Sequence, residues 1–463
     1  MRHAGKLQTS SRLPSTERKA IRTIALLPWG HIIEDFLDIV GIGLDAFCNE
    51  MTGGWMFGYV EALRRANISV VLFCISGREE NIRTTVHRPT GARIVILPTP
   101  KWYMSVHKRM ANPYGRSASQ TFGVSRAKRL ISPFLGLVRE LSPYFSTPLR
   151  SLASELQSQH CDAILCQDYE FPRFDAAVAI GRQLGIPVFA CFQGGDYQRS
   201  RLERWIRPWA MRKATGFIIA PATEIQRVSS KYGVPVQKIA RIFNPLDLND
   251  WFPVDQAEAR QALGIPAASR VAVWHGRIEI QQKGLDQLVE IWSRVCALHS
   301  NADVRLLLVG SGRHAAELQA KIGTSRLHGI HWVKEYVHDR AQLRRCLCAG
   351  DIYVFPSRHE GLPSAPVEAM ACGLPVIAAN ASGIADIFEG GISDGGIVVS
   401  RANCGDFVDR FATALGELLE SPKESADLGK LALARARRAF SVDVVGKQFA
   451  SFLQSSSTTD FCR

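Results

Sequence analysis

The sequence lacks several features that would place it in common protein classes. Among its 463 residues no apolar run approaches the ~20 residues of a membrane-spanning helix. Residues 1–20 are polar and basic and do not have the pattern of a signal peptide. The eleven cysteines are an odd number without a C-x2-C pair, which argues against a zinc framework and a closed set of disulfides. We therefore expect a cytoplasmic protein, not integral to the membrane, with reduced cysteines used as small apolar residues.

Acidic residues are missing from residues 81–139, which contain eleven Lys or Arg. Such a segment attracts anions, namely nucleic acid, anionic lipid headgroups or a phosphorylated acceptor. No helix-turn-helix, zinc-finger or RNP pattern supports nucleic acid. Two interpretations stay open: contact with an anionic membrane surface, or a solvated face that confers solubility. The cations concerned include Lys108, Arg109, Arg126, Lys128 and Arg129.

Apolar strands alternate with amphipathic helices along most of the chain, which predicts parallel sheets covered on both faces. The alternation stops at a linker, residues 242–253, and then restarts. A chain of this length suits two or three domains. We therefore predict an α/β protein of two Rossmann-like domains facing across a cleft. The expected strands are residues 23–27, 70–75, 93–97, 163–166, 188–192 and 216–220 in the first domain, and 271–275, 304–309, 351–355 and 375–379 in the second.

Four elements of the second half follow directly after predicted strands. They are Gly276-Arg277, Gly310-Ser311-Gly312, Glu360 and Asn380. In sheets of this kind ligands bind outside the carboxyl ends of the strands. We expect these elements to form one wall of one site.

Two glutamates stand eight positions apart across a Gly-Leu-Pro turn. Glu360 lies just past a buried strand, and Glu368 lies in the first turn of the following helix, whose positive end suits a diphosphate. A simpler interpretation is also open. Glu368 would then only complement the helix dipole, with Ser364 as the cap, and Glu360 would pair with Arg358 on the surface.

Two cations follow the strand that ends at His275. Arg277 can bind a diphosphate bidentately, and Lys283 adds a compact charge before Gly284 and a helix. The alternative is that they form surface ion pairs with Glu279 or Asp286.

The spacing of the two glutamates resembles the E-x7-E signature of retaining glycosyltransferases with the GT-B fold, family 4 (glycosyl transferases group 1). The R-x4-K-G pattern of that family is one residue longer here, between Arg277 and Lys283. The resemblance implies that Arg277, Lys283 and Glu360 are catalytic and that Glu368 binds the ribose hydroxyls of a nucleotide. The other donor-binding residues that it implies are Gly54, Gly276, Gly310, Gly361, Leu362 and Ser364.

On the first domain the resemblance implies contacts with the acceptor or the reacting sugar. Gly53 follows the first strand in a glycine pair, and Gln193 and Asp196 follow a later strand. Many relatives have a histidine where this chain has Gln193. This chain therefore lacks the imidazole that those relatives have at this position. A side-chain amide can still form a hydrogen bond with a sugar hydroxyl.

Residues 202–209 form an apolar stripe among arginines, with Leu202, Trp205, Ile206 and Trp209 on one helical face. Core packing of this stripe is the favoured interpretation, and a membrane interface is the other. Residues 445–453 resemble the terminal helix that returns to the first domain. The predicted divisions are a disordered lead (1–20), an acceptor-binding domain (21–250), a nucleotide-sugar-binding domain (251–435), a return helix (436–456) and a tail (457–463).

The expected function is transfer of a sugar, of hexosyl type, from a nucleotide diphosphate donor to an acceptor hydroxyl, in cell-surface polysaccharide or glycolipid synthesis. The resemblance implies that the anomeric configuration is retained. We expect no cofactor and no divalent metal, because no D-x-D cluster follows a strand and fixed cations can stabilise the leaving diphosphate. The expected partners are the donor, a sugar or lipid-linked acceptor and an anionic membrane surface at the cytoplasmic face. A nucleotide-sugar epimerase, a phosphorylase or a non-catalytic partner in polysaccharide assembly remains an alternative.

Overall fold

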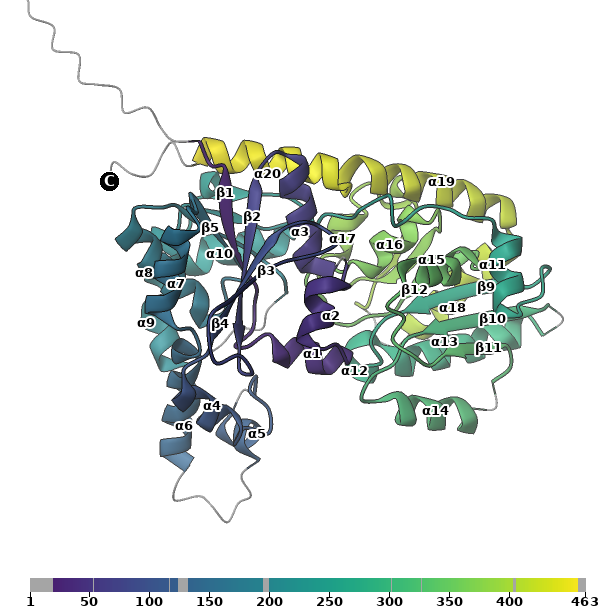
Figure 1. Ribbon diagram of the computed structural model, residues 1–463. Coiled ribbons are helices and arrows are strands. Elements are labelled where there is room, and N and C mark those ends of the chain that lie inside the picture. Colours follow the sequence, from purple (N-terminus) through teal and green to yellow (C-terminus); the bar gives the residue numbers. More distant parts are fainter. Residues whose placement is uncertain are drawn as a thin grey trace, which may run out of the picture.

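The chain folds into two α/β domains that lie side by side (Figure 1). The computed structural model describes residues 20–52, 54–115, 117–123, 132–194, 200–300, 302–325, 327–402 and 405–456. Several residues singled out from the sequence therefore lie outside the described residues. They are Gly53, Arg126, Lys128, Arg129 and Asp196, together with most of the expected lead and the expected tail.

The first domain is built on an eight-stranded sheet with the order β3-β4-β2-β1-β5-β6-β7-β8. All neighbours are parallel except β3, which is antiparallel to β4. The central strands are buried apolar runs, as a sheet covered on both faces requires. The strands are β1 Thr23–Leu27, β2 Ser69–Ser76, β3 Arg83–Val86, β4 Arg93–Pro98, β5 Ala163–Gln167, β6 Val188–Cys191, β7 Gly216–Ile218 and β8 Ile239–Ala240.

Helices surround this sheet, and their ends carry ordinary sequence signals. Helix α9 begins with a capping box, in which Ser200 and Glu203 satisfy each other's backbone N–H groups. The helices are α1 Glu34–Val40, α2 Leu44–Asn49, α3 Gly54–Arg65, α4 Lys101–His107, α5 Ala118–Phe122, α6 Ser132–Leu141, η2 Ser142–Phe145, α7 Leu149–Ser158, α8 Pro172–Leu184, α9 Arg201–Lys213, α10 Ala222–Tyr232 and η3 Val236–Lys238.

The second domain has a six-stranded, fully parallel sheet with the order β11-β10-β9-β12-β13-β14. Its strands are β9 Arg270–His275, β10 Val304–Val309, β11 Ile330–Val333, β12 Ile352–Phe355, β13 Val376–Ala379 and β14 Gly396–Val399. Its helices are α11 Gln256–Leu263, α12 Ile280–Lys283, α13 Leu285–Leu298, α14 Ala315–Thr324, α15 Arg340–Cys348, α16 Ala365–Ala371, α17 Ile384–Ile387, η4 Gly391–Asp394, α18 Phe407–Glu420 and α19 Pro422–Ala439.

The chain crosses between the domains twice, and the two crossings are hydrogen-bonded to each other. The N–H of Leu246 donates to the carbonyl of Phe440 at 2.7 Å, and the N–H of Val442 donates to the carbonyl of Leu246 at 3.1 Å. After the second crossing, helix α20 (Val442–Ser456) packs on α3, and α19 and α20 run along one side of both domains (Figure 1). The expected return of the terminal helix to the first domain is confirmed.

Helix α20 approaches α3 so closely that one position requires glycine. A Cβ atom placed on Gly446 would lie 2.2 Å from the carbonyl oxygen of Ala62. Further along, the rings of Tyr59 and Phe449 are 5.0 Å apart. The last helix is thus part of the core of the first domain.

The strands predicted from the sequence are present with boundaries shifted by at most two residues. The structure adds β3, β8, β11 and β14, which are the two edge strands of each sheet. The nine cysteines among the described residues are free thiols, and eight of them are buried, which confirms their expected use. Within the described residues, no helix combines the length and the apolar character needed to cross a membrane.

Candidate functional site

The carboxyl edge of the second sheet brings several predicted site residues together. The strands β10, β9, β12 and β13 are consecutive neighbours, so the loops that follow them share one edge. Gly276 and Gly310 adopt positive φ angles of 148° and 138°. A Cβ atom on Gly310 would lie 2.0 Å from the carbonyl oxygen of Gly276, so these loops meet backbone to backbone. The glycines thus allow the loops after β9 and β10 to pack directly against each other at this edge.

Glu368 is held by a histidine that the sequence analysis did not single out. His275, the last residue of β9, places its Nε2 atom 2.8 Å from Glu368 Oε2. Burial alone would raise the pKa of Glu368. The hydrogen bond to His275, the charges of His275 and Arg340, and the hydroxyl of Ser364 outweigh it and hold the pKa below its usual value. Glu368 is therefore an oriented carboxylate whose side chain is still 17% exposed.

The amide nitrogen of Glu368 is bonded within helix α16 rather than by a side-chain cap. Its N–H donates to the carbonyl of Ser364 at 2.9 Å, and the Ser364 side chain makes no capping bond. The interpretation of Ser364 as a side-chain cap is therefore wrong. Ser364 is exposed, while its neighbour Leu362 packs against the core of the second domain.

Lys283 and Glu360 bond to each other at 2.7 Å, and both side chains are largely buried. None of the surface pairs considered for them is formed, because Arg358 instead binds Asp286 bidentately, at 2.7 and 2.8 Å. The pair thus brings two predicted catalytic residues from α12 and the loop after β12 into contact.

Glycine at position 284 makes this pairing possible. Gly284 has a φ of 66°, and a Cβ atom there would lie 2.1 Å from the carbonyl oxygen of Pro356. The N–H of Arg358 also donates to the carbonyl of Gln282 at 2.8 Å. The start of α13 can therefore lie directly against the residues that follow β12. This close approach places Lys283 next to Glu360.

Arg277 is the more accessible of the two predicted cations, with 49% of its side chain exposed. Its Nε atom lies 3.8 Å from Glu279, so the alternative surface pair is formed, although at long distance. Glu279 also accepts from Arg313 at 2.7 Å. Burial raises the pKa of Tyr336, and the positive charges of Arg340 and Arg277 act against this shift. Arg277 is thus near enough to Tyr336 to affect its ionisation.

The first domain reaches this edge through the loop after β6, among other contacts. A Cβ atom on Gly361 would lie 2.4 Å from the Cα atom of Gly194, so the loop after β6 touches the loop after β12. A Cβ atom on Gly383 would in turn lie 2.3 Å from the carbonyl oxygen of Gly361. Gln193 is therefore beside the loop that carries Glu360.

The side chain of Gln193 is fixed by residues that the sequence did not point to. Its amide nitrogen donates to the hydroxyl of Tyr59 at 3.0 Å and to Asn244 Oδ1 and Cys191 Sγ at 3.3 Å each. The Tyr59 hydroxyl donates to Asn244 at 3.0 Å. The amide nitrogen is thus occupied, and the amide oxygen has no hydrogen-bond partner among the described residues.

Two further observations complete the description of the site. Gly54, the second residue of the predicted glycine pair, is the first residue of α3. Within the described ranges, no group of three or more His, Cys, Asp and Glu is arranged to hold a metal ion. Metal independence stays a prediction.

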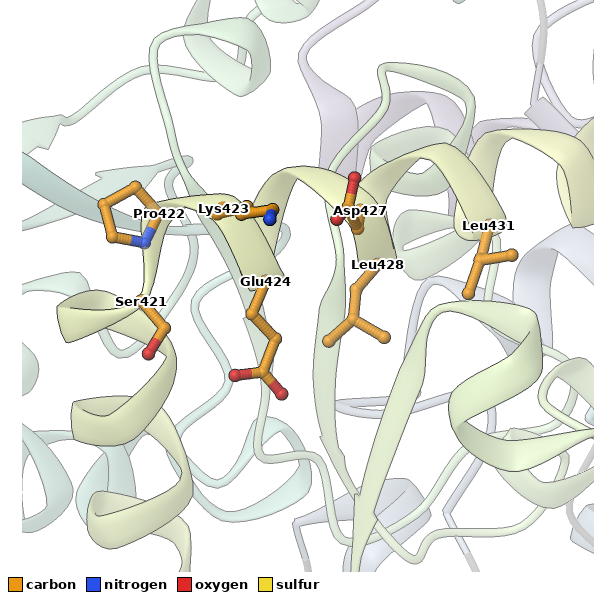
Figure 2. A pocket seen from close by; sticks show the side chains of 7 residues that line it. All are labelled: Ser421, Pro422, Lys423, Glu424, Asp427, Leu428 and Leu431. Atoms are coloured by element: carbon orange, nitrogen blue, oxygen red, sulfur yellow. The ribbon is translucent and has the colours of Figure 1, made fainter.

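A surface pocket lies elsewhere, at the start of α19 (Figure 2). It is lined by Ser421 and by side chains of α19 that include Glu424, Leu428 and Leu431. All of its walls come from one helix and the residue before it, and it contains none of the predicted site residues. It therefore has no part in the candidate site.

Comparison with known proteins gives two matching families and several relatives. Residues 269–421 match the family described as glycosyl transferases group 1, and residues 113–250 match Glycosyltransferase Family 4. D-inositol 3-phosphate glycosyltransferase 2 of Catenulispora acidiphila is 32% identical over 223 residues, 47% of this chain and 50% of the relative. The lipopolysaccharide core biosynthesis mannosyltransferase LpsB of Rhizobium meliloti is 28% identical over 209 residues, 44% of this chain and 56% of the relative. The chain spans about half the length of these curated relatives.

Solved structures with low sequence identity share the whole fold. Sucrose-phosphate synthase from Thermosynechococcus elongatus superposes with a TM-score of 0.63 at 19% identity, covering 94% of this chain and 98% of its own. HepE from Anabaena, in complex with UDP, superposes with a TM-score of 0.64 at 16% identity. The match covers 94% of this chain and 100% of HepE. These likenesses show that the chain has the GT-B fold, and segments in both of its domains match models of the group 1 and family 4 glycosyltransferases.

Proposed function

We propose that this protein is a glycosyltransferase that moves a sugar from a nucleotide diphosphate donor to an acceptor hydroxyl. One observation carries the proposal. The carboxylate of Glu368, oriented by His275, and the Lys283–Glu360 pair lie at one sheet edge that the first domain reaches through Gly194. A fixed acceptor for ribose hydroxyls, a cation for the diphosphate and a facing domain are what such a transfer needs.

The donor class follows from the chemistry of this edge. His275 occupies one oxygen of Glu368, and the exposed part of the carboxylate can accept the hydroxyls of a ribose. Arg277 and Lys283 would bind the diphosphate, and Lys283 would share its charge between the phosphate and Glu360. A fold neighbour, HepE, was crystallised with UDP and with UDP-glucose, which supports a nucleotide-diphosphate sugar.

The acceptor would bind from the side of the first domain. The amide oxygen of Gln193 can accept a hydrogen bond from a sugar hydroxyl, in place of the histidine of many family members. Gly53 and Asp196 remain predicted contacts. The name of the relative LpsB refers to lipopolysaccharide core biosynthesis, which supports an acceptor in glycolipid or polysaccharide synthesis at the cytoplasmic face of a membrane.

The transfer would retain the anomeric configuration by front-face displacement. The bond between the anomeric carbon and the diphosphate oxygen breaks, and the acceptor oxygen bonds to the same face of that carbon. The acceptor proton passes to the departing phosphate oxygen. Arg277 and Lys283 stabilise negative charge that is larger in the transition state than in the bound donor, so they accelerate the chemical step. No divalent metal is needed, because these cations neutralise the leaving group.

The proposal is tested with the purified full chain, a series of nucleotide-diphosphate sugars and simple glycoside or glycolipid acceptors. We expect one donor to raise the melting temperature and its sugar to appear on an acceptor, with the donor's configuration by NMR. Conversion of the donor alone would identify an epimerase, dependence on free phosphate a phosphorylase, and binding without turnover a non-catalytic partner. Activity lost with EDTA and restored by Mg²⁺ would overturn the metal-free mechanism.

A further inference from the structure

Helix α9 places two of its charged residues, Glu203 and Arg207, inward and its tryptophans outward. Its buried side chains include Glu203 and Arg207, whereas Trp205 is 83% exposed and Trp209 is 37% exposed. The expectation that the apolar stripe of this helix packs in the core is therefore wrong. An exposed tryptophan of this kind leaves ~150–250 Å² of mostly apolar surface without a partner.

The reversal has a cause inside the first domain. Arg207 bonds Asp175 at 2.6 Å, Glu170 at 3.2 Å and Glu203 at 3.5 Å, and all four side chains are buried. A buried arginine is tolerated only with such partners. The inner face of α9 thus holds this ion-pair cluster together with Ala210 and Met211 of the apolar core, and its outer face is not needed to hold the helix in place.

The outer face combines aromatic side chains with unpaired cations. Its only acid, Glu203, points inward. Arg201, Arg204, Arg212 and Lys213 are exposed, and none has an ion-pair partner within the part of the chain that the structure describes. The face therefore carries four uncompensated positive charges around two tryptophans. We define the α9 face as Arg201, Leu202, Arg204, Trp205, Ile206, Trp209, Arg212 and Lys213.

Apolar exposure continues on the helix next to it. Helix α6 contacts α9, and the N–H of Arg201 donates to Glu140 of α6 at 3.3 Å. On α6, Phe134 is 67% exposed and Leu137 is 52% exposed. Both helices lie at the side of the first domain that faces away from the second domain (Figure 1). A partner bound here would leave the candidate site free.

We propose that the α9 face docks the protein on an anionic lipid bilayer. The tryptophans enter the headgroup region, where their apolar rings and indole N–H groups are both satisfied, and the arginines bind lipid phosphates. Charge complementarity selects this occupant, because a face with four cations and no exposed acid attracts an anionic surface. This inference does not depend on the proposed function. It also places the contact on α9 rather than in residues 81–139.

The test is cosedimentation of the full chain with phosphatidylcholine vesicles that contain or lack phosphatidylglycerol. We expect binding to the anionic vesicles that falls with salt, because the Debye length shrinks from about 8 Å at physiological ionic strength to about 3 Å at 1 M. Trp205→Ser with Trp209→Ser should lower the partition coefficient at least tenfold. Replacing Arg201, Arg204 and Arg212 together by Gln should also lower the partition coefficient at least tenfold.

Matched controls separate the α9 face from other exposed residues. Leu298→Ser with Arg437→Gln changes one exposed apolar and one exposed basic side chain of the second domain, and should leave binding unchanged. All variants change exposed side chains, so their melting temperatures should match that of the wild type. Unchanged binding of both α9 variants would overturn the proposal. So would loss of binding only in Lys108→Gln with Arg109→Gln, or a change of oligomeric state without a change in vesicle binding.

Discussion

At the scale of single residues, two of the predicted site residues already neutralise each other. Lys283 donates to Glu360 at 2.7 Å. A diphosphate that enters the site gives Lys283 a second, stronger anionic partner, and Glu360 then becomes available to a sugar hydroxyl. Under the proposed function, the pair would couple the arrival of the donor phosphate to the release of a carboxylate beside the sugar.

The two cations should act on the chemical step. Arg277→Ala and Lys283→Ala should each lower kcat on the order of 10²-fold, because each removes charge stabilisation from the departing diphosphate. The double variant should lose less than the product of the two effects, since both residues serve one group. Steady-state kinetics checks this, with Arg294→Ala as the control, because Arg294 forms an exposed ion pair with Asp409 between α13 and α18. A raised KM with an unchanged kcat would assign either residue to ground-state binding only.

Glu368 should contribute to donor binding rather than to chemistry. Glu368→Ala should weaken nucleotide diphosphate binding by about 1.5–3 kcal/mol, the range for hydrogen bonds to a charged group. Glu368→Gln should lose less, because one acceptor oxygen remains. Titration calorimetry measures both values. An unchanged dissociation constant in Glu368→Ala would leave Glu368 only its bond to His275 and its place near the helix dipole.

The sequence analysis identified the charged residues at this sheet edge, but not the residues that hold them in position. Glu360, Glu368, Arg277 and Lys283 were predicted because their spacing resembles the family's E-x7-E and R-x4-K-G patterns, in loops and helices that follow buried strands. His275 was not, although it ends the strand before Arg277. A histidine at the end of an apolar strand looks like a core residue until its partner, 93 positions away, is known.

At the scale of secondary structure, the sequence predicted helix α9 but not which side of it is buried. A stripe of Leu202, Trp205 and Trp209 has the same spacing whether it faces the core or the solvent. The deciding partners of Arg207 are Asp175 and Glu170, which are distant in sequence. The missed strands have a similar explanation. All four are edge strands, whose exposed sides weaken the apolar run that marks a central strand.

The ion pairs beneath α9 should make stability depend on pH. Burial raises the pKa of Glu203 from 4.5 to about 7. Because its pKa is raised, Glu203 binds a proton in the folded protein that it releases in the unfolded chain. The stability gained in this way is complete below pH 4.5 and is lost as the pH rises through 7. Between pH 5 and 8 the free energy of unfolding should therefore fall relative to Glu203→Gln, by up to about 3 kcal/mol.

Chemical denaturation of the wild type and of Glu203→Gln at several pH values measures this difference. The side-chain amide introduced by Glu203→Gln keeps an oxygen that can accept from the N–H of Ser200, so the capping box is partly preserved. Glu258→Gln is the matched control, because Glu258 also stands third in its helix but is exposed. Parallel pH curves for wild type and Glu203→Gln would mean that Glu203 is ionised throughout.

At the scale of the whole molecule, the two domains meet at glycines near the candidate site. Gly361→Ala would place a Cβ atom 2.4 Å from the Cα atom of Gly194, and backbone atoms on both sides cannot rotate away. The domains would have to separate. We expect kcat to fall on the order of 10–100-fold, because small displacements of reacting groups are costly.

Turnover measurements and small-angle scattering test this prediction together. The radius of gyration of Gly361→Ala should increase, while its melting temperature should change little because the cores are untouched. Gly323→Ala in α14 is the control, since nothing lies within 4 Å of the added carbon. Wild-type turnover in Gly361→Ala would show that the catalytic state does not need this contact.

The position of α20 in the first domain also governs how the protein is made. Val445, Phe449 and Leu453 belong to the same core as Ile24 and Leu26, although they are synthesised only after the whole second domain. At roughly 5–20 residues per second, the ~200 residues between β8 and α20 take on the order of 10–40 s to emerge. During that time the first domain lacks one wall and exposes part of α3. We therefore expect the first domain, although it is translated before the second, to finish folding after it. Nascent chains stalled before Val442 should bind chaperones until α20 is synthesised.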